Sequence, residues 1–146
     1  MVALLTTLSA VGVATAREED LAKRLLRASE GLQMPGSEAD SSWRFVSYPQ
    51  EEELPTSERM ASLEGYANYP EGSMKRLDFD ATFDSLGRVQ PWMDHGQKKS
   101  AHGFARLRKL FHREYGNTLA VYRCDTNMYG EVRIYFLAST PTASPA

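Results

Sequence analysis

Two segments near the C-terminal end of the chain predict a β-hairpin. Residues 118–124 and 131–137 are both rich in β-branched and aromatic residues, which suit a pleated, half-buried surface. The intervening residues 125–130 contain Asp, Asn and Gly, which favour a turn. We therefore expect the two segments to pair as antiparallel strands.

The second segment has two different faces, because successive side chains of a strand point in opposite directions. One face carries Val132, Ile134 and Phe136 and is entirely apolar. The other face carries Tyr135 and Leu137, so it is not wholly polar either. We therefore expect protein to cover both faces of the hairpin.

Two other stretches have the three- and four-residue spacing of apolar positions that is typical of amphipathic helices. The first covers residues 17–31, where Gly31 fits the C-terminal end and Pro35 prevents continuation. The second covers residues 100–115. One of its sides is lined by Phe104, Leu107, Leu110, Phe111 and Tyr115.

The apolar side of an amphipathic helix and the apolar face of a sheet must pack against each other to form a core. We predict that the second helix packs on the wholly apolar face of the hairpin. The residues predicted to be buried together are Phe104, Leu107, Phe111, Val132, Ile134 and Phe136.

The middle of the chain mixes short elements with turns. Residues 43–48 predict a strand, and Thr56 can cap a short helix that ends at Gly65. Residues 77–83 begin an ordered segment whose pattern leaves a strand and a helical turn both open. Residues 87–96 predict a loop. The whole pattern favours a single α+β domain.

Both ends of the chain are expected to lie outside that domain. Residues 1–16 are small and apolar and end in Ala-Thr-Ala, as at a cleavage site, but no Lys or Arg precedes them as in a secretory signal. The run is also too short to span a membrane. We predict an apolar leader or flexible extension at 1–16, the domain at 17–142 and a flexible tail at 143–146. A cytoplasmic location is expected, or export if residues 1–16 are a signal peptide.

Composition and charge agree with a globular domain. The chain has 146 residues, of which 42% are hydrophobic and 25% charged, and its net charge of −2 argues against general nucleic-acid binding. The polar side of the second helix is basic and is interpreted as a solvent-exposed face. Its residues and their neighbours are Lys98, Lys99, Arg106, Arg108, Lys109 and Arg113.

Residues with catalytic chemistry do not form a recognisable site. The three histidines lack the four-residue spacing that puts two imidazoles on one helical face, and the single cysteine, Cys124, is typical of a small buried hydrophobe. Asp78 and Asp80 would share a face only in a strand, and a solvated face is the simpler interpretation. We predict no catalytic residue, no metal and no cofactor. A small hydrolase that uses Asp78, Asp80 or a histidine is kept as an alternative.

An acidic segment follows the first helix. Residues 37–40 read Ser-Glu-Ala-Asp and lie just past the helix stop, where the chain should be exposed. An exposed carboxylate on an anchored loop suits contact with a cation of a partner. Solvation alone is the other explanation.

Four blocks together resemble the nuclease A inhibitor family, whose members block sugar-non-specific DNA/RNA endonucleases. Their order and spacing carry the resemblance, which covers residues 21–142. The blocks are residues 26–32, the acidic segment 37–40, residues 77–80 with Trp92 and Gly96, and the hairpin followed by Thr140 and Pro141.

The resemblance implies a three-layer α/β/α sandwich with a small mixed or antiparallel sheet, and an inhibitor, not an enzyme. In that family the glutamate of the Ser-Glu loop approaches the catalytic metal region of the nuclease, and the matching residue is Glu38. A carboxylate suits that region because it normally attracts an anionic phosphate. The residues expected to meet the partner are Ser37, Glu38, Asp40, Trp43, Glu51, Glu52 and Glu53.

The partner implied is a protein, a sugar-non-specific DNA/RNA endonuclease. No direct nucleic-acid or membrane partner is expected, and the free protein is expected to be a monomer. The alternative is an interaction domain of the same fold that binds a partner other than a nuclease.

Overall fold

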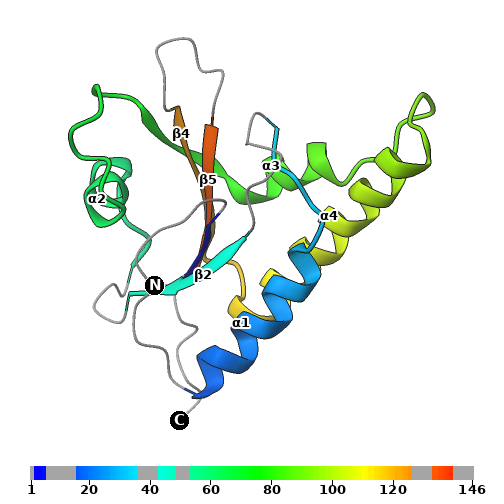
Figure 1. Ribbon diagram of the computed structural model, residues 1–146, viewed down its shortest axis with the longest axis horizontal. Coiled ribbons are helices and arrows are strands. Elements are labelled where there is room, and N and C mark those ends of the chain that lie inside the picture. The colour runs from blue at the N-terminus through cyan, green and yellow to red at the C-terminus, as the bar shows by residue number, and fades with distance from the viewer. Residues whose placement is uncertain (1, 6–15, 36–42, 49–52, 126–132, 140–146) are drawn as a thin grey trace.

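The computed structural model describes residues 2–5, 16–35, 43–48, 53–125 and 133–139 (Figure 1). These residues contain helices and strands of the predicted α+β class. In chain order the elements are β1 (Val2–Leu5), α1 (Ala16–Ser29), β2 (Arg44–Ser47), α2 (Ser57–Leu63), β3 (Met74–Asp78), α3 (Phe79–Leu86), α4 (His95–Tyr115), β4 (Leu119–Asp125) and β5 (Arg133–Ser139).

The five strands form one sheet in the order β2-β1-β5-β4-β3, and each neighbouring pair is antiparallel. The predicted hairpin is confirmed as β4 and β5, whose register runs from Leu119 opposite Ser139 to Asp125 opposite Arg133. Strand β4 ends one residue later, and β5 two residues later, than the sequence indicates. Their connection, residues 126–132, lies outside the described residues.

Strand β1 lies between β2 and β5 and pairs with both of them. Residues 1–16 are expected from the sequence to form a leader or flexible extension, whereas Val2–Leu5 form this strand. Four consecutive apolar residues carry no alternation, so their pattern cannot distinguish a strand from an apolar leader. The partners of β1 lie far along the chain, where a local pattern gives no information about pairing.

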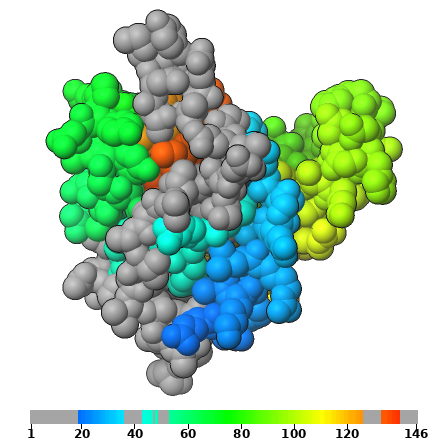
Figure 2. All heavy atoms as spheres, in the orientation of Figure 1, coloured from blue at the N-terminus to red at the C-terminus, as the bar shows by residue number. Residues whose placement is uncertain are grey.

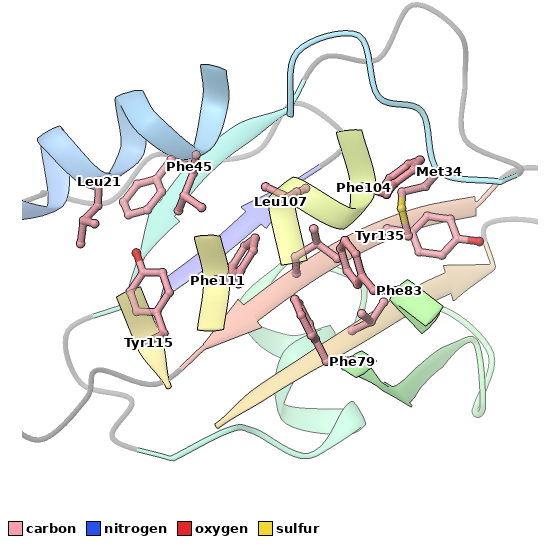
Figure 3. Close-up of a cluster of buried hydrophobic side chains, with 13 residues drawn as sticks. Leu21, Met34, Phe45, Phe79, Phe83, Phe104, Leu107, Phe111, Tyr115 and Tyr135 are labelled. Atoms are coloured by element: carbon pink, nitrogen blue, oxygen red, sulfur yellow. The ribbon is translucent and has the colours of Figure 1, made fainter. Parts of the chain in front are cut away.

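One face of the sheet is covered by α1, α3 and α4 (Figure 3). Alternate strand positions on this face, Val121, Tyr135 and Leu137, pack with the apolar sides of these helices. The helices supply Leu21, Leu25, Phe79, Phe83, Phe104, Leu107, Phe111 and Tyr115, all of which are buried.

The opposite face is covered by α2, which contributes the fully buried Met60. The strand positions on this face include Tyr122, Ile134 and Phe136. Thr56 caps α2 as predicted, because its Oγ1 accepts a hydrogen bond from the backbone N–H of Arg59 at 3.2 Å. The expectation of cover on both faces of the hairpin is confirmed.

The prediction of one shared core is wrong in its pairing of faces. Phe104, Leu107 and Phe111 are buried together, but Ile134 and Phe136 belong to the cluster beneath α2. Val132 lies outside the described residues. Because both faces of β5 are apolar, side-chain alternation separates them correctly but does not indicate which face meets which helix.

The undecided segment 77–83 contains both a strand end and a helix start. Strand β3 ends at Asp78, and this residue is also the N-cap of α3, with its Oδ2 accepting a hydrogen bond from Ala81 N at 2.8 Å. The Asp78 backbone is extended while the following residues are helical. Asp78 and Asp80 therefore do not share a strand face.

Helix α4 begins earlier than predicted, at His95 and not at residue 100. Asp94 and Gln97 form a capping box in which each side chain accepts a hydrogen bond from the backbone N–H of the other. The N-terminal half of α4 and the turn before it extend away from the rest of the domain (Figure 2). Within the described part of the chain, no helix has the length and apolar character needed to cross a membrane.

Candidate functional site

The chain that leads from α1 into the acidic loop is held firmly against the domain. Gly31 has φ of +77°, which turns the chain out of the helix, and Leu32 N donates to Ser29 O at 3.0 Å. Met34 is only 1% exposed and belongs to the cluster beneath α1, α3 and α4. Tyr135 of β5 donates its hydroxyl to Pro35 O at 2.7 Å.

The chain that leaves the loop is held by Trp43. Its indole Nε1 donates to Leu32 O at 2.9 Å, and its ring packs on the same buried cluster. The end of the loop is thus tied to its beginning, because Leu32 lies only a few residues before Pro35. We call residues 36–42 the acidic loop and Pro35 and Trp43 its two anchors.

Helix α4 adds to this arrangement by its close approach to Leu32. A Cβ placed on Gly103 would lie 2.6 Å from Leu32 Cδ2, so a larger residue at position 103 would push Leu32 aside. The absence of a side chain on Gly103 lets α4 pack against the segment that carries the first anchor.

Most of the residues predicted to meet the partner cannot be placed. Ser37, Glu38, Asp40, Glu51 and Glu52 lie outside the described residues. Of the remaining two, Glu53 is exposed, and Trp43 is partly buried as an anchor. The structure therefore shows what holds the acidic loop at both ends, and the contacts of its carboxylates stay a prediction.

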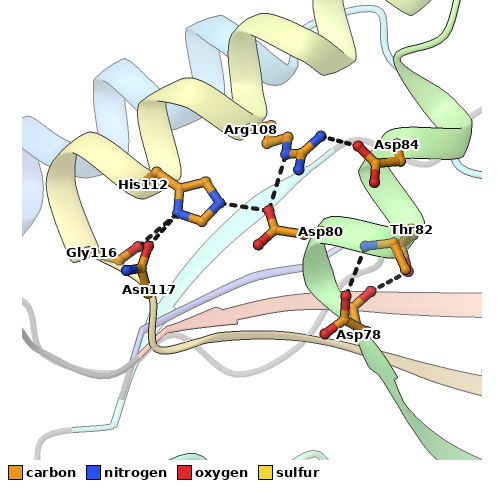
Figure 4. Close-up of polar contacts among 9 residues, drawn as sticks. Asp78, Asp80, Thr82, Asp84, Arg108, His112, Gly116 and Asn117 are labelled. Atoms are coloured by element: carbon orange, nitrogen blue, oxygen red, sulfur yellow. Dashed lines mark hydrogen bonds and ion pairs between the residues drawn. The ribbon is translucent and has the colours of Figure 1, made fainter.

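Apart from the acidic loop, a cluster of polar side chains joins α3 to α4 (Figure 4). Asp80 Oδ1 accepts from His112 Nε2 at 2.6 Å and from Arg108 Nε at 3.0 Å, and Arg108 Nη1 also pairs with Asp84. His112 Nδ1 lies 3.0 Å from Gly116 O. The imidazole of His112 thus bridges Asp80 of α3 and the backbone at the C-terminal end of α4.

These contacts explain the two aspartates as structural groups. Asp78 caps α3, and Asp80 joins α3 to α4 through Arg108 and His112. The remaining histidines, His95 and His102, are exposed on α4. Among the described residues, no group of three or more His, Cys, Asp or Glu side chains is placed to hold a metal ion.

Asp80 should make the stability of the domain depend on acidity. The hydrogen bond from His112, aided by Arg108, lowers the pKa of Asp80 below its ordinary value. Because the folded pKa is the lower one, the stabilisation is present above the unfolded pKa of about 3.9 and is lost as the pH falls through the folded pKa. Asp80 is half-exposed, so the effect should be below about 1 kcal/mol.

Urea unfolding of the wild type and Asp80→Asn at neutral pH and at about pH 3 checks this expectation. The wild type should be the more stable protein at neutral pH, and the difference should shrink in acid. An equal difference at both pH values would show that the carboxylate charge contributes nothing.

Cys124 is fully buried in β4. Burial raises the pKa of its thiol to about 11, and the nearby Asp125 carboxylate acts in the same direction. A thiol in this environment stays protonated at neutral pH, and the thiolate is the nucleophilic form. Cys124 therefore fits the predicted role of a small buried hydrophobe.

Trp92 is the most exposed large hydrophobic residue in the part of the chain that the structure describes, at 71%. It lies in the turn before α4, as does the 42%-exposed Val89. Exposed tryptophans are frequent anchors of protein interfaces. Sequence reasoning used Trp92 only for the resemblance, because a local pattern does not show that a tryptophan is exposed.

The described residues form a small α+β domain in which the stretches on either side of residues 36–42 are held against the core. The family model described as nuclease A inhibitor-like protein matches residues 19–146, which is most of the chain. The chain therefore belongs to the nuclease A inhibitor-like family, and the resemblance seen in the sequence is confirmed. No curated protein matches the chain. Strand β1 lies outside the matched range.

Proposed function

We propose that this protein is a stoichiometric inhibitor that blocks the active site of a metal-dependent, non-specific nuclease with its acidic loop. Membership of the nuclease A inhibitor-like family supports a nuclease as the protein partner. The observation that carries the loop proposal is the fixing of both anchors, Pro35 by Tyr135 and Trp43 by Leu32.

The physical argument concerns the free energy of binding. A loop whose ends are already fixed loses less conformational entropy when it meets a partner, so more of its contact energy contributes to affinity. A carboxylate of Glu38 would then enter the field of the nuclease metal ion, in place of a substrate phosphate. Asp40 and the acidic residues 51–53 are proposed to lie nearer the edge of the contact.

Trp92 is proposed as a second contact with the partner. Large aromatic side chains contribute much of the binding energy at protein interfaces, and Trp92 needs no rearrangement of the domain to become accessible. We also propose that the protein acts without catalytic turnover of its own. Its proposed state before binding is a monomer.

Replacing Tyr135 by phenylalanine should weaken inhibition by several-fold. The change removes only the hydroxyl that donates to Pro35 O, which releases the first anchor and should also cost about 0.5–1.5 kcal/mol of stability. The measurement is a titration of nuclease activity with the variant, together with its urea unfolding curve.

Tyr122→Phe is the matched control. Its hydroxyl also donates to a proline carbonyl, Pro55 O, but from the strand face beneath α2. This variant should lose similar stability and inhibit as well as the wild type. Equal losses of inhibition in the two variants would show that stability, not the anchor, is responsible.

A further inference from the structure

A cleft of about 530 Å³ lies between α3 and α4 and is lined in part by the polar cluster. Its lining residues are Phe83, Asp84, Gly87, Arg88, Ala105, Arg108, Lys109 and His112. We call it the α3/α4 cleft. The chain as a whole has a net charge of −2, whereas this lining holds three Lys or Arg side chains and one carboxylate, Asp84.

Arg108 is held rigidly at this cleft. Its Nε donates to Asp80 Oδ1 at 3.0 Å and its Nη1 pairs with Asp84, so two carboxylates of α3 fix the plane of the guanidinium. The structure records no hydrogen bond from Arg108 Nη2 to any described residue. A guanidinium has five N–H donors, and this one therefore retains donors for a ligand.

Two further cations at the cleft lack a partner carboxylate. Arg88 and Lys109 are exposed and form no ion pair with the described residues, in contrast to Arg108. Arg88, Arg108 and Lys109 supply three positive charges and Asp80 and Asp84 two negative ones, so the group carries one excess positive charge, which favours an anion such as phosphate.

Gly87 lets the C-terminal end of α3 lie close to α4. It ends α3, and a Cβ added to it would lie 3.1 Å from Phe83 O and 3.4 Å from Ala105 Cβ. Because Gly87 lies close to α4, the next residue, Arg88, lines the same cleft as Arg108 and Lys109 of α4. The three basic side chains are thus placed around one opening by two different elements.

We propose that the α3/α4 cleft binds a phosphate group, with Arg108 as the fixed donor and Arg88 and Lys109 as the charge partners. Inorganic phosphate and the phosphate of a nucleoside monophosphate share this chemistry. The proposal does not depend on the acidic loop, because the residues that line the cleft all lie between positions 83 and 112 of the chain.

The test is a titration of the full chain, labelled with ¹⁵N, with sodium phosphate and separately with a nucleoside 5′-monophosphate at constant ionic strength. Saturable changes in the amide signals of Gly87, Arg88, Arg108 and Lys109 are expected for both, with dissociation constants of about 1 mM. Tighter binding of the monophosphate would identify a nucleotide as the ligand, and equal binding would identify the phosphate group alone. Sodium chloride at the same ionic strength should produce no saturable change.

Two double variants that remove equal charge distinguish a specific phosphate site from non-specific electrostatic attraction of phosphate. Arg88→Gln with Lys109→Gln should weaken phosphate binding by about tenfold or more. Lys98→Gln with Lys99→Gln removes the same amount of charge from α4, outside the cleft lining, and should leave binding within about twofold.

Equal weakening by both double variants, or no saturable change in the wild type, would overturn the proposal. Both double variants should retain nuclease inhibition, so failure of the phosphate site and failure of the inhibitor proposal give different results.

Discussion

Replacing Phe111 by alanine is expected to lower the free energy of unfolding by about 3–5 kcal/mol, because the change leaves a cavity in a closely packed cluster. Phe111 is fully buried, and its ring centroid lies 5.3 Å from that of Phe79 and 6.0 Å from that of Tyr115. The side chain therefore connects α3 to α4 and both helices to the sheet. Urea unfolding measures the loss, and Lys98→Ala, an exposed change on the same helix, should stay within about 0.5 kcal/mol of the wild type.

Combining Phe111→Ala with a change on the other face of the sheet tests whether the two buried clusters are separate. Ile134→Val on the α2 face should cost about 0.5–1.5 kcal/mol. Because Phe111 and Ile134 lie on opposite faces of the sheet, the double variant should lose the sum of the two single losses within about 0.5 kcal/mol. A coupling energy well above that value would indicate one shared core, as the sequence pattern predicts.

Glu38→Gln is expected to weaken inhibition by about 2–5 kcal/mol, the range for losing one partner of a desolvated charge pair. Glutamine keeps the shape of the side chain and removes the charge that would enter the field of the nuclease metal. Thermal stability should change little, because Glu38 is expected from the sequence to be exposed and exposed carboxylates contribute little to folding. The measurements are the inhibition constant and the melting temperature of the same preparation.

Two other carboxylates serve as comparisons for Glu38. Asp40→Asn should weaken inhibition less than Glu38→Gln, since Asp40 is proposed to lie nearer the rim. Glu58→Gln makes the same chemical change on α2, over the opposite face of the sheet, and should leave inhibition unchanged. A Glu38→Gln protein that inhibits as well as the wild type would place the contact elsewhere on the domain.

Elements with a clear local period were predictable from the sequence. The apolar side of α4, the cap at Thr56 and the hairpin of β4 and β5 are all present, because each depends on residues close together in the chain. Boundaries were less accurate. The sequence places the start of α4 too late because Pro91 before the cap and Gly96 in the first turn both favour a loop.

Features that depend on distant residues were not predictable. The face of β5 that meets α4 is set by the whole packing of the domain, and the position of β1 is set by pairing with β2 and β5. The sequence places Arg108 on a solvent-exposed face, whereas its side chain is partly buried against Asp80 and Asp84 of α3. Its helical position indicates the polar side of α4 but not the carboxylates that face that side.

In the candidate site, too, the features set by nearby residues were predictable and those set by distant residues were not. Gly31 and Pro35 were visible as the end of α1, and the acidic loop was visible as a charged segment. The bond from Tyr135 to Pro35 joins residues 100 positions apart, and no pattern in either segment indicates it. Family resemblance supplied the proposed role of the loop, and the structure added a physical reason why its ends are fixed.

The most direct measurement is the titration of a sugar-non-specific, metal-dependent nuclease with the wild-type protein. The account predicts that nuclease activity falls in proportion to added protein and is abolished near an equimolar ratio, with the metal ion in excess throughout. Full nuclease activity at a large excess of the protein, against the native partner as well as such nucleases, would contradict the inhibitor proposal and leave the fold unchanged.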